Sequence, residues 1–336
     1  MAAPSWQSPT PVGCEPFSEF QRNEPPFLRN AAPDFLIRIP NAAVLKYNRT
    51  PFCVDLGREE LLCHSSMDSV FCTPESYWQS SCASMQVAET LDLKGRALLL
   101  DSRFGKEFYH FYSSVLGRLA KYLSFDMHLD AIDHFILPEA APFVVAWADI
   151  LGIPPEKRRH LCERQMFRTD ELLVPSNNHE FDHRTLAFIR NRIPASTKSA
   201  GFEKIYISRS QSVNGRHVLN EKQVIEQVLS PRGFRVVRLE DFSLYDQAAI
   251  MRSADTIVAP HGGGLTNVLF CRRGTRILEL FNKNWIVFCY ARIGAMLGLE
   301  PFYHVAADSH DMDIQIDVKA FPAVIDQCLQ SAARES

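Results

Sequence analysis

Short apolar runs alternate with amphipathic segments between residues 203 and 281, and this alternation limits the fold more than any other feature of the sequence. Such an order is typical of a parallel sheet with helices on both faces. The first predicted helix has Asn220 at its N-cap and Gly233 just past its end, and Ser243 and Asp246 have the spacing of a capping box. The predicted strands are 203–209, 234–240, 255–260 and 276–281, and the predicted helices are 220–233, 243–254 and 265–271.

The first half of the chain has a less regular pattern. Short apolar runs between residues 34 and 95 predict strands joined by turns. Further strands are predicted at 95–103 and 134–139, and helices at 108–125 and 141–153. Because polar stretches lie on both sides of residue 190, we expect three parts: a proline-rich extended arm over 1–33, a domain over 34–195 and a second domain over 196–336.

Composition and charge exclude several classes of protein. The 336 residues carry a net charge of -3 and the sequence pI is near 6.4, which argues against a surface that coats nucleic acid. The first residues lack a basic start and an apolar core, and no run reaches the roughly 18 apolar residues of a membrane span, so we expect a cytoplasmic protein. The nine cysteines contain no C-x-x-C pair, which favours buried free thiols over a zinc site.

Three consecutive glycines follow a predicted strand in the stretch "IVAPHGGGLTN" at 257–267. Ligands bind beyond the carboxyl ends of the strands in an open parallel sheet. Glycines permit positive φ and the close approach of a bulky group, and the first amides of a helix attract anions such as phosphate. From the residues alone, a phosphate site, a tight turn without a ligand and an incomplete dinucleotide motif of a nicotinamide-dependent enzyme all stay open. A P-loop is excluded because G-x-x-x-x-G-K-[ST] does not occur.

The segment 206–281 resembles the signature of glycosyltransferase family 61. The resemblance rests on an "ISR" strand, an R-x-x-x-N-E helix start, a helix that contains Gln, an "HGAGLTN"-like element, and F-x-x-x-G followed by "EL". These elements fall on Ser208 and Arg209, Arg216–Glu221, Gln247, His261–Asn267, Gly274 and Glu279, with Gly263 in place of the usual alanine. Upstream, 109–119 is similar to the family's N-domain helix, where His110 fits but Ser114 replaces a frequent aspartate.

The resemblance implies a GT-B architecture, in which two Rossmann-like domains face each other across a cleft. It implies an inverting glycosyltransferase that uses a nucleotide-sugar, UDP-linked in characterised eukaryotic members, and a glycan or lipid-linked glycan acceptor. Bacterial relatives are associated with capsular polysaccharide synthesis, and a lipid-linked acceptor is compatible with peripheral membrane association. We expect no cofactor and no nucleic-acid partner. The alternative is a nucleotide-sugar-binding protein of the same fold that is catalytically weak or inactive, because Ser114 replaces the acid.

The amides of Gly263, Gly264 and Leu265 are expected to hold the diphosphate of the donor, with Arg209 and Arg216 as further donors of hydrogen bonds. For each arginine, a surface position without a ligand is the alternative. The full set of expected donor-binding residues is Ser208, Arg209, Arg216, Gly262, Gly263, Gly264, Leu265, Thr266, Asn267 and Glu279.

Three polar residues of this region have more specific expectations. Glu279 is expected at the end of its strand, where a carboxylate accepts the ribose hydroxyls or pairs with Arg276. Asn267 and Gln247 are expected to tie the loop to neighbouring backbone more than to touch the ligand.

Two histidines are the catalytic candidates. His261 is expected to contact a phosphate or the sugar, or else to pack in the core. His110 is expected to be the base, because an unperturbed imidazole accepts a proton near neutral pH, and a buried structural histidine is the alternative. Asp101 and Asp126 are unranked substitutes for the missing acid. The D-x-D in "HDMDIQID" at 310–317 lies near the tail, where we expect a strand and a helix cap, so no metal site and metal-independent transfer are predicted.

Overall fold

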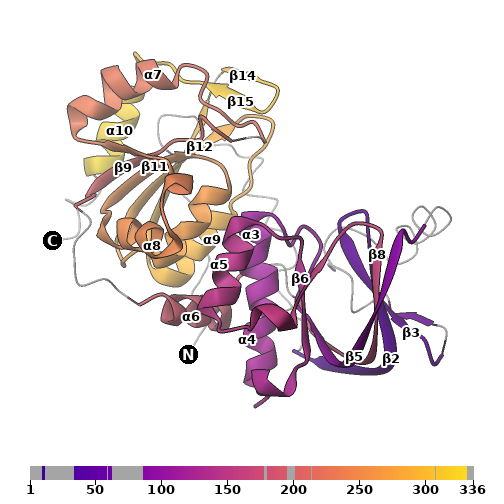
Figure 1. Ribbon diagram of the computed structural model, residues 1–336. Helices are drawn as coiled ribbons and strands as arrows, with labels where there is room; N and C mark the ends of the chain where they lie inside the picture. Colours follow the sequence, from indigo (N-terminus) through magenta and orange to yellow (C-terminus); the bar gives the residue numbers. More distant parts are fainter. Residues whose placement is uncertain are drawn as a thin grey trace. The chain divides into compact units, whose positions relative to one another are not determined.

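The structure is a computed structural model that describes residues 10–11, 34–58, 60–62, 86–177, 180–194, 201–212, 214–306 and 308–330. The chain divides into two compact units, one of which is Pro25–Arg192, while the other combines Met1–Glu24 with Ile193–Ser336. Each unit has its own sheet with helices beside it (Figure 1), which confirms the mixed α/β class. Apart from Thr10 and Pro11, the arm expected over 1–33 lies outside the described residues, as do Cys14, Cys63, Cys72 and Cys82.

The Pro25–Arg192 unit is built on a seven-stranded sheet. Its strands are β2 (Leu36–Tyr47), β3 (Thr50–Asp55), β4 (Glu60–Leu62), β5 (Glu89–Leu99), β6 (His134–Pro138), β7 (Arg158–Leu161) and β8 (Gln165–Pro175). The order is β4-β3-β2-β8-β5-β6-β7, with antiparallel pairs up to β8 and parallel pairs from β8 to β7. The residues on both sides of Asn41 form the single strand β2, whose register with β8 continues across Asn41 despite its φ of 47°.

The helices of this unit begin with a continuous segment that occupies the predicted 108–125 helix and contains a π-helical stretch. Its apolar residues, among them Phe111, Leu116 and Leu119, are buried. The helical segments are α3 (Phe108–His110), the π segment η4 (Phe111–Val115), α4 (Leu116–Ser124), η5 (Leu129–Ala131), α5 (Pro142–Ile150), η6 (Pro155–Lys157) and α6 (His183–Arg192).

The other unit contains a six-stranded sheet in which every neighbouring pair is parallel, as the alternation of strands and helices predicts. Its strands are β1 (Thr10–Pro11), β9 (Lys204–Ile207), β10 (Arg235–Val237), β11 (Thr256–Pro260), β12 (Arg276–Asn282) and β13 (Glu300–Ala306), in the order β1-β13-β12-β11-β9-β10. A separate antiparallel hairpin consists of β14 (Asp308–His310) and β15 (Asp313–Gln315).

Helices cover both faces of this parallel sheet. They are α7 (Glu221–Val224), η7 (Ile225–Leu229), η8 (Ser230–Arg232), η9 (Leu239–Asp241), α8 (Leu244–Ser253), η10 (Gly263–Phe270), α9 (Cys289–Leu297) and α10 (Phe321–Gln330). Figure 1 shows α7 and α10 on one side of the strands and α8 and α9 on the other. Between the sheet and the first pair lies a core that includes Val258, Leu278, Val228 and Ile325.

The helix caps match the sequence in part. Gly233 takes a left-handed φ of 80° after η8, and the Ser243 hydroxyl accepts a hydrogen bond from the Asp246 amide, as predicted. Asn220 is the N-cap residue of α7, as predicted, but its side chain does not cap the helix; it donates to the Ile316 carbonyl and accepts from the Ile316 amide. A partner far along the chain has replaced the local one.

Candidate functional site

Three parallel strands bring the predicted donor-binding residues to one edge of the six-stranded sheet. Ser208 and Arg209 follow β9, His261 and the glycines follow β11, and Glu279 lies within β12. Since these strands are adjacent and parallel, their carboxyl ends meet at the edge where ligands bind in such sheets.

The glycine stretch has a different structural role from the one expected. None of its three glycines has a positive φ in the left-handed region, and Gly262 is extended, with a φ of 165°. A Cβ on Gly262 would lie 1.9 Å from Nη1 and 2.4 Å from Cζ of Arg209. The absence of a side chain at this position therefore makes room for the guanidinium of Arg209.

The helix η10 begins at Gly263, two residues earlier than predicted, and it is a 3-10 helix. The Leu265 amide donates to the Gly262 carbonyl at 2.9 Å, so the expectation that it binds phosphate is wrong. No side chain caps this helix start among the described residues, and Gly263 and Gly264 are partly exposed. Two backbone amides are thus left for an anion.

Two arginines concentrate positive charge beside this helix start. Nη2 of Arg209 donates to Ser212 Oγ at 2.7 Å and to the Gly215 carbonyl at 3.2 Å. By contrast, the Nε atoms of Arg209 and Arg216 are buried and have no hydrogen-bond partner among the described residues. Burial, and then the charge of Arg216, lower the pKa of Arg209. The arrangement favours a bound anion, because an anion would supply the missing acceptors and offset the repulsion between the two guanidinium groups.

His261 and Glu279 form a buried pair. Nδ1 of His261 lies 2.5 Å from Oε1 of Glu279, and the ring of His261 packs against Phe281 and Tyr290. Burial raises the pKa of Glu279, and the contact with His261 opposes this shift. A carboxylate at Nδ1 fixes the orientation of the ring and leaves Nε2 for a substrate.

Glu279 therefore differs from the expectation in both its position and its partner. It is in the middle of β12 and not at its end, and its side chain is only 4% exposed. The expected alternative partner, Arg276, donates instead to the Leu329 carbonyl. The structure assigns Glu279 a contact with His261 in place of one with ribose.

Several other predicted residues support the backbone of the site. Nδ2 of Asn267 donates to Gln247 Oε1 at 3.0 Å, and Nε2 of Gln247 donates to the carbonyls of Leu239 and Phe242. Thr266 is completely buried. Asn267 and Gln247 thereby hold η10 against the segment before α8, as expected for these two residues, and we withdraw the expectation that Thr266 contacts the donor.

Ser208 also belongs to an internal network. Its hydroxyl contacts Glu221 Oε2 and Ser210 Oγ, each at 3.0 Å, and Tyr206 donates to the same Glu221 carboxylate. Ser208 thereby connects the end of β9 to α7, and it positions the backbone that leads to Arg209.

His110 lies in the Pro25–Arg192 unit, on the last turn of α3. Its ring packs against Phe104 and Tyr109, and burial together with the charge of Arg103 lowers its pKa to about 4. The expected pKa near that of free imidazole is thus wrong, because burial disfavours the charged ring. Ser114, one turn further on, is completely buried.

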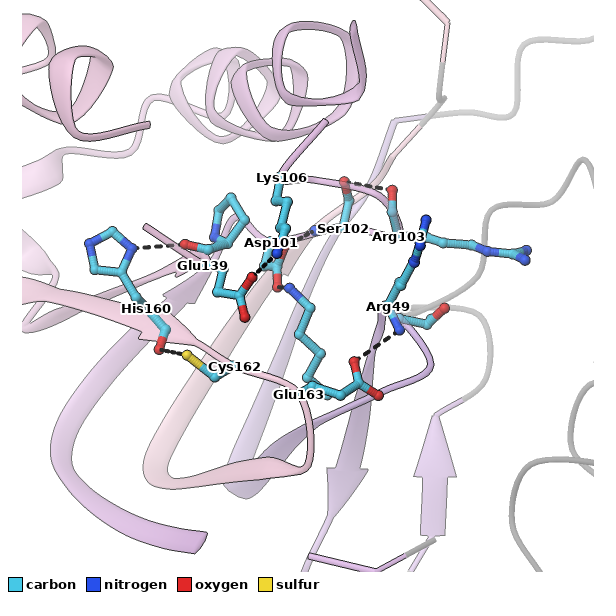
Figure 2. Close-up of polar contacts among 12 residues, drawn as sticks. Arg49, Asp101, Ser102, Arg103, Lys106, Glu139, His160, Cys162 and Glu163 are labelled. Atoms are coloured by element: carbon cyan, nitrogen blue, oxygen red, sulfur yellow. Dashed lines mark hydrogen bonds and ion pairs between the residues drawn. The ribbon is translucent and has the colours of Figure 1, made fainter. Parts of the chain in front are cut away.

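The two substitute acids take different positions. Asp101, which follows β5, is completely buried, with Oδ2 2.7 Å from Nζ of Lys46 and Oδ1 accepting from the Ser102 amide. Figure 2 shows Asp101 near Glu139, which follows β6 and pairs with Lys106. Asp126 is exposed beyond the end of α4, at the opposite end of the helical segment from His110. Asp101 is thus engaged by Lys46 and Ser102, and Asp126 lies too far along the helical segment to assist His110.

A small pocket near His261 contains residues that the sequence did not single out. The exposed Trp285 follows the end of β12, and Asn282 forms the last position of that strand. The signal available in the sequence was a tryptophan shortly after the end of a predicted strand. The pocket is lined by Arg216, Pro260, His261, Leu280, Asn282, Trp285, Met312 and Ile314.

The D-x-D segment forms the turn and start of the hairpin β14–β15, and Asp317 then accepts from the Lys319 amide ahead of α10. Oδ1 of Asp313 accepts from the His217 amide at 2.8 Å. Within the part of the chain that the structure describes, no three His, Cys, Asp or Glu side chains gather in a way that could hold a metal ion. No described helix has the length and apolar character needed to cross a membrane.

These observations define an α/β protein with two sheets, one of which is parallel and ends in a cluster of arginine, glycine and histidine residues. The model of the family Glycosyltransferase 61 matches residues 108–278, from the start of α3 into β12, which is just over half of the chain. The chain therefore belongs to glycosyltransferase family 61, as the sequence predicted, and family membership makes it a glycosyltransferase with a donor and an acceptor substrate. No curated protein matches the chain.

Proposed function

We propose that this protein is an inverting, metal-independent glycosyltransferase of the GT-B type. It transfers a sugar from a nucleotide-sugar, UDP-linked as in characterised eukaryotic members of the family, to a glycan or lipid-linked glycan in surface polysaccharide synthesis. The observation that carries the proposal is the pair Arg209 and Arg216, each with a buried Nε that has no hydrogen-bond partner among the described residues, beside the start of η10 at Gly263 and Gly264. A diphosphate is the anion that such a set of donors suits best.

The positive charge of Arg209 and Arg216 explains how the nucleoside diphosphate leaves the sugar. The acceptor oxygen forms a bond to the anomeric carbon while the bond between that carbon and the phosphate oxygen breaks, and the electron pair leaves with the nucleoside diphosphate. Arg209 and Arg216 stabilise the negative charge that develops on the leaving group. The position of Arg209 is set before the substrate binds, since Ser212 and Gly215 already hold its guanidinium.

The proton of the acceptor hydroxyl needs a base, and His261 is the better candidate of the two histidines because a carboxyl group holds its ring. Glu279 holds Nδ1 of His261, so that Nε2 accepts the proton and the carboxyl group stabilises the charged ring that results. His110 is a weak base with a pKa of about 4, and we propose that it contacts the acceptor as a neutral ring.

A second candidate function is nucleotide-sugar binding without turnover. It is favoured by Ser114, which is fully buried where relatives often have an acid. The two functions differ in whether the donor is consumed when it binds.

The test is release of UDP from a UDP-sugar in the presence of EDTA and an oligosaccharide acceptor. We expect turnover by the wild-type protein, its loss in His261→Ala and a weaker effect in His110→Ala. Binding of UDP without turnover would favour the second function. Stabilisation against heat by NAD, with no effect of any nucleoside diphosphate, would refute both.

The remaining parts of the proposal concern location. We propose that the protein works in the cytoplasm and meets a lipid-linked acceptor at the membrane surface. Cys162 and Cys328 are free thiols, which suits a reducing compartment. Fractionation of the expressing cell tests this, and the expected result is recovery of the protein without detergent.

A further inference from the structure

The loop that carries both arginines is held by a chain of polar contacts that starts at Asp313. Oδ1 of Asp313 accepts from the His217 amide at 2.8 Å and lies 3.4 Å from Nδ1 of the same residue. Nε2 of His217 is 2.8 Å from the Ser212 carbonyl, and Ser212 Oγ accepts from Nη2 of Arg209 at 2.7 Å. Asp313 is thereby connected to Arg209 through two intermediate residues.

The loop needs such support because its backbone is unusual. Gly215 and Arg216 both have positive φ, of 65° and 62°, and arginine rarely adopts this conformation on its own. A Cβ on Gly215 would lie 3.5 Å from Oδ1 of Asp313 and 3.7 Å from Cβ of Met312, so the loop packs directly on the hairpin turn. Contacts from outside the loop therefore stabilise the conformation that directs Arg216.

The hairpin turn is itself fixed to the sheet. Nδ2 of Asn282, at the end of β12, donates to the carbonyls of Asp311 and Asp313 at 3.0 and 2.9 Å. Asn282 is only 4% exposed, so these hydrogen bonds are shielded from water. Asp313 therefore lies on a turn that is hydrogen-bonded to the sheet, whereas the side chain of Asp311 is exposed.

We propose that Asp313 is a positioning residue for the two arginines of the phosphate site, a role that rests on the proposed function. Its carboxylate holds His217, and His217 and the turn hold the loop that carries Arg209 and Arg216. The second aspartate of the D-x-D thus orders the nucleotide site without binding a metal. Asp313 lies outside residues 108–278, so the family match does not assign it this role.

The variants that test this are Asp313→Ala, Asp313→Asn and Asp311→Asn. In Asp313→Asn, the amide oxygen of the new side chain can still accept from the His217 amide. Asparagine also suits the left-handed backbone at Asp311, where φ is 48°. UDP is the probe, and its affinity is measured by calorimetry in EDTA. Thermal unfolding shows that each variant is folded.

We expect Asp313→Ala to weaken UDP binding about 5- to 30-fold, and Asp313→Asn and Asp311→Asn to stay within about threefold of the wild type. A gain in wild-type UDP affinity when Mn²⁺ replaces EDTA, lost in all three variants, would indicate a metal site and overturn the proposal. Unchanged UDP affinity in Asp313→Ala would overturn it as well. If the wild type binds no UDP, the proposed function has failed for this donor, and a second measurement decides the role of Asp313.

That measurement is amide hydrogen exchange, which needs no ligand. Asp313→Ala is expected to exchange faster than the wild type over residues 208–212 and 214–217, while Asp311→Asn is expected to match the wild type. Equal exchange in Asp313→Ala and the wild type would show that the carboxylate does not hold the loop.

Discussion

The contact between Gly262 and Arg209 makes a single methyl group a sharp test of the phosphate site. In Gly262→Ala, the new Cβ would lie 1.9 Å from Nη1 of Arg209. Since non-bonded heavy atoms approach to about 3.5 Å, the guanidinium must move by roughly 1.5 Å. The φ of 165° suits alanine, so the backbone is not strained and the effect is confined to the side chain of Arg209.

The expected magnitude follows from the hydrogen bonds that this shift breaks. Arg209 bonds Ser212 at 2.7 Å and Gly215 at 3.2 Å, and neither bond survives a displacement of that size. Hydrogen bonds of charged groups each contribute about 1.5–3 kcal/mol, and Arg209 is partly exposed, so we expect a loss of about 1–3 kcal/mol in unfolding free energy. A misplaced guanidinium should weaken UDP binding about 10- to 100-fold.

The assay is calorimetric titration of UDP together with urea unfolding, and Gly294→Ala, in α9 and outside the phosphate site, is the matched control. A Cβ on Gly294 would lie 3.5 Å from Leu299 Cβ and 4.0 Å from Leu299 Cδ1, which are ordinary contacts. We expect this variant to bind UDP like the wild type. If both alanine variants bind alike, Gly262 does not act through Arg209 and the steric argument is refuted.

Three further variants test other parts of the structure. Glu279→Gln should lower kcat about 10- to 100-fold with little change in UDP affinity, because the neutral amide cannot stabilise a charged His261 ring. His110 has a pKa of about 4 in the folded protein and an ordinary pKa of 6.5, so the unfolded chain binds more protons between these two values. The free energy of unfolding therefore falls by up to about 3 kcal/mol as the pH falls through this range. His110→Gln should flatten this pH dependence, measured by urea unfolding at pH 4 to 7. Asp101→Asn should cost about 3–5 kcal/mol of unfolding free energy, because Lys46 would remain charged and buried without its partner.

Each of these variants has a control on an exposed residue. Glu203→Gln lies at the amino end of β9, away from the site, and should leave kcat unchanged. His128→Gln should keep the wild-type dependence of stability on pH. Lys222→Ala removes an exposed ion pair with Glu226 and should change stability by less than about 0.5 kcal/mol. Equal effects in a variant and its control would contradict the corresponding prediction.

Local sequence patterns were enough to determine the class of the protein. The alternation of apolar runs and amphipathic segments predicted the parallel sheet of the unit that contains Ile193–Ser336. Ser243 predicted the N-cap of α8. The motif residues from Ser208 to Glu279 indicated the family. These features depend on residues within one segment or on spacing along the chain, which the sequence displays directly.

The functions of single residues were decided by tertiary structure. His261 pairs with Glu279, which is 18 positions away, while Asn220 and His217 contact residues 96 positions away. Gly262 looked like a site for unusual φ, yet its neighbour Arg209 explains the missing side chain. Periodicity shows which face of a segment is buried, but the atoms that meet there depend on strand order and register, which form only when the whole unit folds.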